Sequence, residues 1–312
     1  MKTLCLMKFS ALGDLTQIEP FLPSLSQHYA ITLFTSPIGY EYYKESSHIS
    51  DFIILPSKKL LDILKIIPKY IHKFDYLVDL QGNNRSKFLS FFSMTTCYSN
   101  YQKNFKIATL TPDVKPYILE NSIYHLDVYS ILASLKISFY FDAYTPKEKK
   151  YIVLNCGSSQ KWVSKRLSLS KWKEISTLLY EKFQLPFVFT GDASEIEYIK
   201  EIAQYIGKES KILAGKTNLQ ELKKTLKNAF LTVSTDSASM HISAVVGTPT
   251  IGIFGPTNWL RAAPFGPWST TVYDTVFYPN SEPPLKNSQK VDYYFDYIDI
   301  SNALTKLMPY LN

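Results

Sequence analysis

A short polar run between two apolar stretches holds the densest group of residues that could do chemistry. The run contains Asp236, Ser237, Ser239 and His241. We predict strands over 231–234 and 250–254 with a short helix between them, whose first N–H groups have no helical partners. Such a helix start favours anions, and phosphate is a natural ligand for it. By itself, however, Asp236 could be a helix cap and His241 a buried core histidine.

A second candidate follows the first predicted strand, where Gly13 and Asp14 end the segment MKFSALGD. Gly13 permits a tight turn or a close ligand, and Asp14 would lie at the carboxyl edge of a sheet. A carboxylate held there could act as a general base that takes a proton from an attacking hydroxyl. An equally good interpretation is that Asp14 caps the next helix.

A third candidate is the loop Gly157-Ser158-Ser159, which is followed by Lys165 and Arg166. Backbone N–H groups and hydroxyls in such a loop can bind phosphate, and a lysine adds a point charge. The Gly-Lys-Ser/Thr ending of a nucleotide-binding P-loop is absent, and taken alone these residues are better interpreted as a solvated basic loop. No histidine pattern has metal-ligand spacing, so we expect no metal.

The composition limits the class of protein. The 312 residues suit two domains, and the three cysteines are scattered, which favours a reducing cytoplasm over a disulfide framework. No apolar run is long enough for a membrane span, and the first residues read as a strand rather than a signal peptide. The net charge of +7 suggests an acidic partner.

The chain alternates strands and helices in two halves, which predicts two parallel sheets covered by helices. Expected strands in the first half are 3–9, 30–35, 51–55 and 76–80, with helices near 20–28, 40–45 and 58–72. A polar linker is predicted over 141–150. Expected strands after it are 151–155, 186–190, 212–214, 231–234 and 250–254, and we expect Ser194 with Glu197, and Asn218 with Glu221, to cap two of the helices. A last helix is expected over 300–311.

Three segments in order resemble glycosyltransferase family 9, the ADP-heptose:lipopolysaccharide heptosyltransferases. They are MKFSALGDLTQIEPFLPSL, GSSQKWVSKRLSLSKWKEI and STDSASMHISAVVGTPTIGIFGPT, and FDYLVDLQGNNRS and LAGKTNLQEL are similar to weaker blocks of the family. The resemblance implies an α/β fold of GT-B architecture, in which two Rossmann-like domains with parallel sheets face each other across a cleft. We place an acceptor-binding domain at 1–148, a nucleotide-sugar-binding domain at 149–295, and a C-terminal helix at 296–312 that crosses back to the first domain.

The resemblance also implies roles for single residues. It places the general base on Asp14 and the donor-binding residues on Ser158, Ser159, Lys165, Glu195, Thr217, Asp236, Ser237, Ala238 and His241, with Glu195 near the ribose and Thr217 near the adenine. We expect Gly13, Lys58, Lys59 and Arg85 to bind the acceptor. Ala238 stands where the family usually has glycine, which would reshape the turn if that position needed a positive φ.

The function implied is inverting, metal-independent transfer of a heptose or related sugar from a nucleotide sugar, expected to be ADP-heptose, to the lipopolysaccharide or lipooligosaccharide inner core. No cofactor is expected. Expected partners are the donor and an anionic lipid-linked saccharide, with no nucleic acid, and we expect a cytoplasmic monomer, with contact to the inner membrane as one option. Lys58, Lys59, Lys65, Lys69 and Lys73 could serve that contact, although such a row is more often a solvated helix face. The alternatives are an epimerase or hydrolase acting on a nucleotide sugar, and a non-catalytic module at the membrane.

Overall fold

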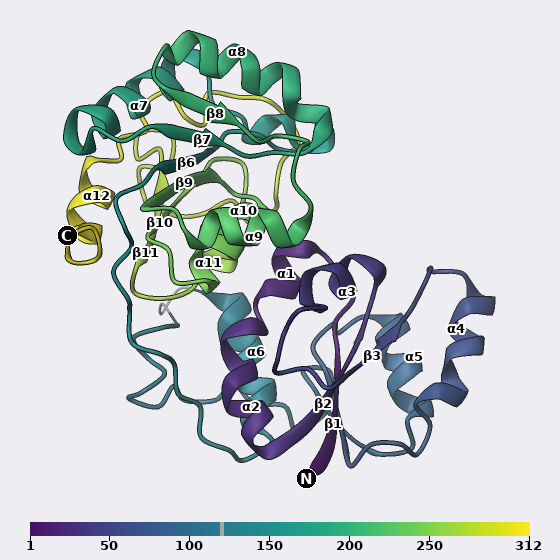
Figure 1. Cartoon of the computed structure of the whole chain (residues 1–312). Helices are drawn as coiled ribbons and strands as arrows, with labels where there is room; N and C mark the ends of the chain where they lie inside the picture. Colours follow the sequence, from purple (N-terminus) through teal and green to yellow (C-terminus); the bar gives the residue numbers. More distant parts are fainter. Residues whose placement is uncertain (119–121) are drawn as a thin grey trace. The chain divides into compact units, whose positions relative to one another are not determined.

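A computed structural model describes residues 1–118 and 122–312 as an α/β chain with two compact units (Figure 1). Unit 1 comprises Met1–Pro116 and Tyr124–Asp142, and unit 2 comprises Tyr117–Ile123 and Ala143–Asn312. The division at Asp142 lies inside the predicted linker and six residues before the expected domain boundary at 148. The sequence does not indicate that the short segment Tyr117–Ile123 is assigned to unit 2.

Unit 1 is built on a parallel sheet with the strand order β3-β2-β1-β4-β5. Its strands are β1 (Lys2–Met7), β2 (Tyr29–Thr35), β3 (Asp51–Ile54), β4 (Tyr76–Asp79) and β5 (Thr96–Ser99). The four predicted strands agree with β1 to β4 within about two residues at each end. β5 was not predicted, because its sequence TCYS is polar and only its last residue is buried.

Helices cover both faces of this sheet. They are α1 (Leu12–Thr16), η1 (Glu19–Phe21), α2 (Leu22–His28), α3 (Pro37–Tyr43), α4 (Leu60–Ile66), η2 (Ile67–Lys69), α5 (Asn84–Phe92) and α6 (Ile123–Ala133). α4 is shorter than the predicted helix over 58–72, because the chain passes into the 3-10 turn η2 before Pro68. α6 was not predicted, since buried residues lie all around it and leave no amphipathic pattern.

Unit 2 is built on a second parallel sheet with the order β11-β10-β9-β6-β7-β8. Its strands are β6 (Ile152–Asn155), β7 (Phe187–Phe189), β8 (Ser210–Ile212), β9 (Leu231–Thr235), β10 (Thr250–Phe254) and β11 (Ser269–Tyr273). The predicted strand over 212–214 therefore starts two residues too late, and β11 was missed. The fully buried Phe187, Phe189 and Trp172 lie in the large core of this unit.

The helices of unit 2 are η3 (Gln160–Lys165), α7 (Leu169–Phe183), η4 (Ala193–Glu195), α8 (Ile196–Ile206), α9 (Leu219–Lys227), α10 (Ala238–Val245), α11 (Trp259–Ala262), α12 (Ser301–Leu307) and η5 (Met308–Tyr310). Figure 1 shows α7 and α8 on one side of the sheet, and α9 and α10 on the other. Ala303, Leu304 and Leu307 of α12 belong to the core of unit 2. The core of unit 2 therefore accounts for the burial of this helix's apolar face, and its crossing to the first domain stays a prediction.

The helix caps test the local predictions directly. Asn218 and Glu221 form the expected capping box, with reciprocal hydrogen bonds of 2.9 and 2.8 Å. The predicted box of Ser194 and Glu197 is wrong, because Asp192 and Glu195 take these roles two residues earlier. In the described part of the chain we find no helix with the length and apolar character needed to cross a membrane.

Candidate active site

The second sheet reverses its direction of growth between β6 and β9. The chain adds β7 and β8 on one side of β6 and then returns to place β9, β10 and β11 on the other. β6 and β9 are neighbours, and Asn155 pairs with Ser234 at their carboxyl ends. Loops that leave such a pair diverge toward opposite faces of the sheet, and ligands of open α/β sheets bind in the crevice there.

The predicted donor residues follow the carboxyl ends of consecutive strands. Ser158, Ser159 and Lys165 come after β6, Glu195 after β7, Thr217 after β8, and Asp236, Ser237, Ala238 and His241 after β9. All four strands are parallel and adjacent in the order β9-β6-β7-β8. The fold therefore brings residues from four separate loops to one edge of one sheet.

An ion pair joins the two loops at the reversal. Lys165 Nζ lies 2.7 Å from Asp236 Oδ2 and also donates to the Asp236 carbonyl at 3.1 Å. The two side chains are only 15% and 11% exposed. Burial raises the pKa of Asp236, but Lys165, His241 and the hydroxyl of Thr257 outweigh it, so the pKa of this carboxyl lies below its ordinary value. The sequence did not predict this pair.

A chain of polar side chains fixes the start of α10. Asn155 Nδ2 donates to Ser237 Oγ at 3.0 Å, and Thr190 Oγ1 donates to Asn155 Oδ1 at 3.1 Å. Ser237 is the N-cap, with extended backbone, but its side chain makes no capping hydrogen bond. The side chain is instead held by Asn155 and by Ser234, 3.1 Å away. The helix thus begins without a side-chain cap on its N–H groups, as an anion site requires.

Ala238 is the first residue of α10, and its φ is not positive. The turn of this chain is therefore formed without a left-handed backbone at Ala238, and its reshaping relative to the family stays a prediction. His241 lies one turn further on and is buried, with 7% of its surface exposed. Its charge is one of the causes that lower the pKa of Asp236, so it lies close to the ion pair.

The loop after β6 is tied down by hydrogen bonds. Thr235 Oγ1 donates to the Gly157 carbonyl at 2.8 Å. Ser158 is buried, and its hydroxyl donates to the Trp162 carbonyl at 2.7 Å. Arg166 clamps Ser158 by donating to its carbonyl at 2.7 Å and to its hydroxyl at 3.3 Å. Ser159, by contrast, is exposed, so its hydroxyl is the better placed of the two serines for a ligand.

Glu195 fills the space left by two glycines. A Cβ added to Gly157 or Gly191 would come within 2.4 or 2.8 Å of its carboxyl group. Oε2 accepts the N–H of Asp192 at 2.8 Å. Burial raises the pKa of Glu195, although the Asp192 N–H and Arg166 oppose this shift. Thr217 is half-buried and directly precedes the Asn218 cap of α9, at the same carboxyl edge of the sheet as Glu195.

In unit 1 the structure places Asp14 in the first turn of α1, with Gly13 beside it. Asp14 Oδ2 accepts the N–H of Ala11 at 3.0 Å, so the capping interpretation is correct. The side chain remains half-buried rather than enclosed, and Oδ1 is not used by this contact. Capping and proton transfer are compatible roles for one carboxylate, because each uses a different oxygen.

Lys8 is a residue near Asp14 that we did not single out from the sequence. It follows β1, is 8% exposed, and donates from Nζ to the Leu80 carbonyl at 2.8 Å. Burial lowers the pKa of Lys8, against the attraction of Asp14, Asp79 and Asp127. A lysine directly after a buried strand was the available signal, since charged side chains are rarely buried without a specific role.

The loop after β4 braces the loop that carries Asp14. Gln81 Oε1 accepts the N–H groups of Phe9 and Ser10 at 2.8 and 3.2 Å. Asp79 Oδ1 in turn accepts the N–H groups of Gln81 and Gly82. The weakly similar segment FDYLVDLQGNNRS therefore has a structural role, which is to shape the region around Asp14.

The expected acceptor residues lie at the same edge of the first sheet but at different distances from Asp14. Arg85 is in the first turn of α5, which follows β4, the neighbour of β1. Lys58 and Lys59 are exposed and follow β3, which is separated from β1 by β2. Arg85 is therefore the better placed of the three to act together with Asp14.

Two doubly wound parallel sheets match the GT-B architecture of solved glycosyltransferases. The sequence profile of glycosyltransferase family 9 (heptosyltransferase) matches residues 125–290, which is more than half of the chain. The chain belongs to this family and is a glycosyltransferase enzyme.

Individual relatives agree with this assignment. The chain is 22% identical over 303 residues to the lipopolysaccharide core heptosyltransferase OpsX of Haemophilus influenzae, covering 90% of this chain and 86% of that protein. A solved family 9 glycosyltransferase from Veillonella parvula has a TM-score of 0.72 at 16% identity and covers 99% of this chain and 98% of its own. Escherichia coli heptosyltransferase WaaC, solved with ADP, has a TM-score of 0.64 at 17% identity, over 86% of this chain and 92% of WaaC.

Proposed function

We propose that this enzyme transfers a heptose from ADP-heptose to a sugar of the lipopolysaccharide or lipooligosaccharide inner core. Membership of the heptosyltransferase family supports the class of sugar, and the name of OpsX supports the class of acceptor. WaaC, which has the same fold, was solved with ADP, and this supports an adenosine diphosphate donor. We further propose that the reaction takes place at the cytoplasmic face of the inner membrane.

The observation that carries the donor site is the meeting of four loops at the carboxyl edge of the second sheet. In our proposal the diphosphate lies at the start of α10, where backbone N–H groups carry no side-chain cap. Lys165 and the exposed Ser159 add donors from the opposite loop. In the same proposal Glu195 binds the ribose, and Thr217 lies beside the adenine.

The proposed reaction is a single displacement with inversion at the anomeric carbon. The acceptor oxygen forms a bond to that carbon from the face opposite the diphosphate, and the carbon–oxygen bond to the diphosphate breaks. The electron pair leaves with ADP, and the proton of the acceptor hydroxyl passes to Asp14. ADP is a stable anion, so Lys165 and the helix N–H groups can stabilise its departure without a general acid and without a metal ion.

The experiment that tests this mechanism is Asp14→Asn. Asparagine keeps an oxygen that can accept the Ala11 N–H, so the turn survives, but the side chain can no longer take a proton. We expect the kcat for heptose transfer to fall by roughly 10²–10⁴-fold, with the affinity for ADP unchanged. Asp113→Asn, at an exposed carboxylate of the same unit, is the control and should retain full activity.

Turnover of Asp14→Asn within a few-fold of the parent would show that Asp14 is not the base. The anomeric configuration of the product, read by NMR, tests inversion separately. Heptose transfer measured in the presence of a metal chelator tests whether the reaction needs a metal ion. Release of free heptose from the donor without acceptor would instead favour a hydrolase.

A further inference from the structure

Helix α4 of unit 1 turns leucines toward solvent. Leu60, Leu61 and Leu64 are 64%, 69% and 45% exposed, while Ile63 and Ile66 on the other side of the helix are buried. A surface helix normally places its large apolar side chains against the core and polar ones outside. α4 therefore has a second apolar side that the packing of unit 1 does not use.

Helix α5 has the same property. Phe88 and Phe91 are 40% and 70% exposed, and Met94, just after the helix, is 53% exposed. The half-buried Phe92 links them, because its ring centroid lies 4.8 Å from that of Phe88 and 5.4 Å from that of Phe91. The three rings form one aromatic cluster that is partly open to solvent.

The two helices belong to one surface. Ile63 and Ile66 of α4 and Leu89 of α5 share a core cluster on the same face of the first sheet. Tyr70, just after η2, donates its hydroxyl to the Leu89 carbonyl at 2.9 Å. Figure 1 shows the two helices side by side. We call the exposed side chains together the α4–α5 patch, which consists of Leu60, Leu61, Leu64, Phe88, Phe91 and Met94.

The segments that carry the α4–α5 patch are also rich in exposed lysine. The exposed lysines on these two segments are Lys58, Lys59, Lys65, Lys69, Lys73 and Lys87. Between Pro56 and Phe74 the sequence has one acidic residue, Asp62, whose carboxylate accepts a hydrogen bond from Ser57 at 2.5 Å. Residues 80–112 contain no acidic residue at all.

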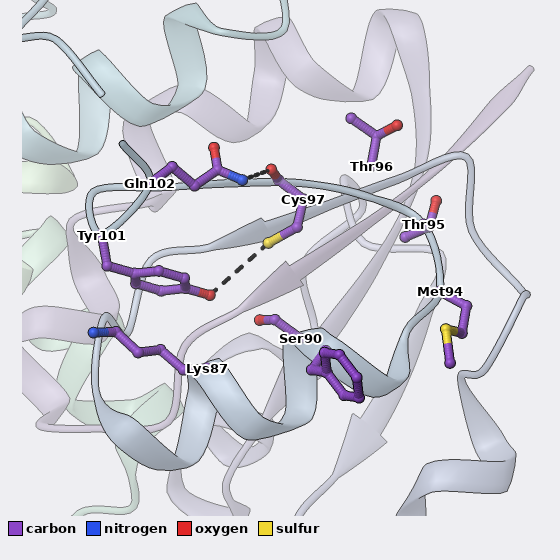
Figure 2. Close-up of a pocket in the computed structure, with 9 residues that line it drawn as sticks. Lys87, Ser90, Met94, Thr95, Thr96, Cys97, Tyr101 and Gln102 are labelled. Atoms are coloured by element: carbon purple, nitrogen blue, oxygen red, sulfur yellow. Dashed lines mark hydrogen bonds between the residues drawn. The ribbon is translucent and has the colours of Figure 1, made fainter. Parts of the chain in front are cut away.

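A shallow groove of about 820 Å³ continues the patch along α5 toward the edge strand β5. Lys87, Phe91 and Met94 line it from the patch side, and Cys97 and Tyr101 from the other. Figure 2 shows Lys87 and Met94 at opposite ends of the groove. The groove thus offers a cation at one end and an apolar side chain at the other, which matches the two parts of a phospholipid.

We propose that the α4–α5 patch docks unit 1 on an anionic phospholipid bilayer, with the leucine and phenylalanine side chains in the acyl boundary and the lysines at the headgroups. Large apolar side chains rimmed by lysine are typical of surfaces that lie in this boundary, where apolar burial and attraction to anionic lipid act together. The charge of the patch selects this partner: each lysine gains at an anionic headgroup, and hardly any carboxylate opposes it.

The test is co-flotation of the full chain with vesicles of phosphatidylcholine alone or mixed with phosphatidylglycerol, without donor or acceptor. We expect binding to the mixed vesicles that falls about tenfold or more when the salt is raised from 0.1 to about 0.5 M. The double variant L61S/F91S and the triple variant K65Q/K69Q/K73Q should each lower the partition coefficient by about tenfold or more. L285S/Y297S, which removes a leucine and an aromatic ring that are 99% and 66% exposed in unit 2, is the matched control and should bind as the parent does.

Sedimentation of the same variants without vesicles separates lipid from protein partners. An unchanged oligomeric state in all variants, together with lost flotation, supports the proposal. Flotation of L61S/F91S equal to that of the parent would overturn it. A parent dimer that L61S/F91S converts to monomer, with flotation unaffected, would also overturn it and assign the patch to contact between copies of the chain. Since no substrate is present, none of these outcomes depends on the proposed heptose transfer.

Discussion

In the proposed donor site, the Lys165–Asp236 ion pair decides how unit 2 would hold a phosphate. A lysine that already has a buried carboxylate partner adds less net charge to the site than a lone lysine would. It is, however, fixed in position, and a fixed donor loses less conformational freedom on binding. We infer that Asp236 acts mainly by holding Lys165 in place and that the α10 N–H groups supply most of the remaining attraction.

Lys165→Met tests the ligand role of this lysine. The affinity for ADP should fall by roughly 10- to 150-fold, since a hydrogen bond to a charged group contributes about 1.5–3 kcal/mol. Lys161→Met, in the same 3-10 turn but exposed, removes the same charge and should change the affinity little. Calorimetric titration with ADP measures both.

The same variant should also destabilise the fold, by about 3–5 kcal/mol, because Asp236 would be left buried without its main partner. The double variant Lys165→Met/Asp236→Asn removes both charges and should recover part of the stability but none of the ADP affinity. If the double variant recovered both the stability and the ADP affinity, Lys165 would affect ADP binding only by stabilising the fold.

Asp236 and Glu195 should affect stability with opposite dependence on pH. The folded pKa of Asp236 is lowered, so its contribution is present above its unfolded pKa of about 3.9 and is lost as the pH falls through the folded pKa. The folded pKa of Glu195 is raised, so its ionisation costs stability as the pH rises through that pKa.

We therefore expect Asp236→Asn to lower the urea midpoint at pH 7 and to differ less from the parent near pH 3. Glu195→Gln should raise the midpoint at pH 7, and this difference should vanish as the pH falls. Urea unfolding at several pH values measures both. Two variants that shift the midpoint in the same direction at pH 7 would contradict the assignment.

At the scale of elements, the loop between β6 and α7 matters because it approaches η4 so closely. Gly157 has no side chain where the carboxyl group of Glu195 lies, and Glu195 in turn holds the Asp192 N–H. The close approach joins the loop proposed to bind the diphosphate to the loop proposed to bind the ribose. Glycine is required here for space rather than for a positive φ.

Gly157→Ala should therefore displace Glu195, because the new Cβ would lie 2.4 Å from its carboxyl carbon. We expect a loss of about 1–3 kcal/mol in stability and weaker donor binding. In a Glu195→Ala background the same substitution should cost much less, since the space is then free. Thermal unfolding of the four variants measures this coupling, and equal costs in both backgrounds would place the strain elsewhere.

At the scale of the whole molecule, the two units divide the proposed work. Unit 1 carries Asp14 and the buried Lys8, and unit 2 carries the four loops of the proposed donor site. Each set lies at the carboxyl edge of its own parallel sheet, as ligand sites of such sheets do.

ADP should consequently slow amide hydrogen exchange in unit 2, chiefly over 156–166 and 235–241. Mass spectrometry of the exchanged chain with and without ADP measures this, and AMP is the control, because it has only one phosphate for Lys165 and α10. Protection by ADP confined to the loops after β1 and β4 would contradict the donor site. UDP and GDP in the same experiment test the choice of adenine.

The sequence by itself determined the alternation of strands and helices, most of the buried strands, and the family. Buried parallel strands such as β2, β9 and β10 appear as apolar runs, and a cap such as Asn218 with Glu221 is a contact between near neighbours, so both can be predicted locally. The family was recognised from three ordered motifs. Short polar β5, and α6 with buried residues on all its sides, carry no periodic pattern and were missed.

Only the tertiary structure decided which of these residues meet. Lys165 and Asp236 are 71 positions apart, and they meet because β6 and β9 pair while β7 and β8 lie on the other side of β6. Strand order depends on long-range packing that no local pattern encodes. The same holds for the buried Lys8 against the Leu80 carbonyl and for Glu195 against Gly157. It holds as well for the α4–α5 patch, since a leucine in an amphipathic segment is assumed to face the core until the sheet beneath it is known.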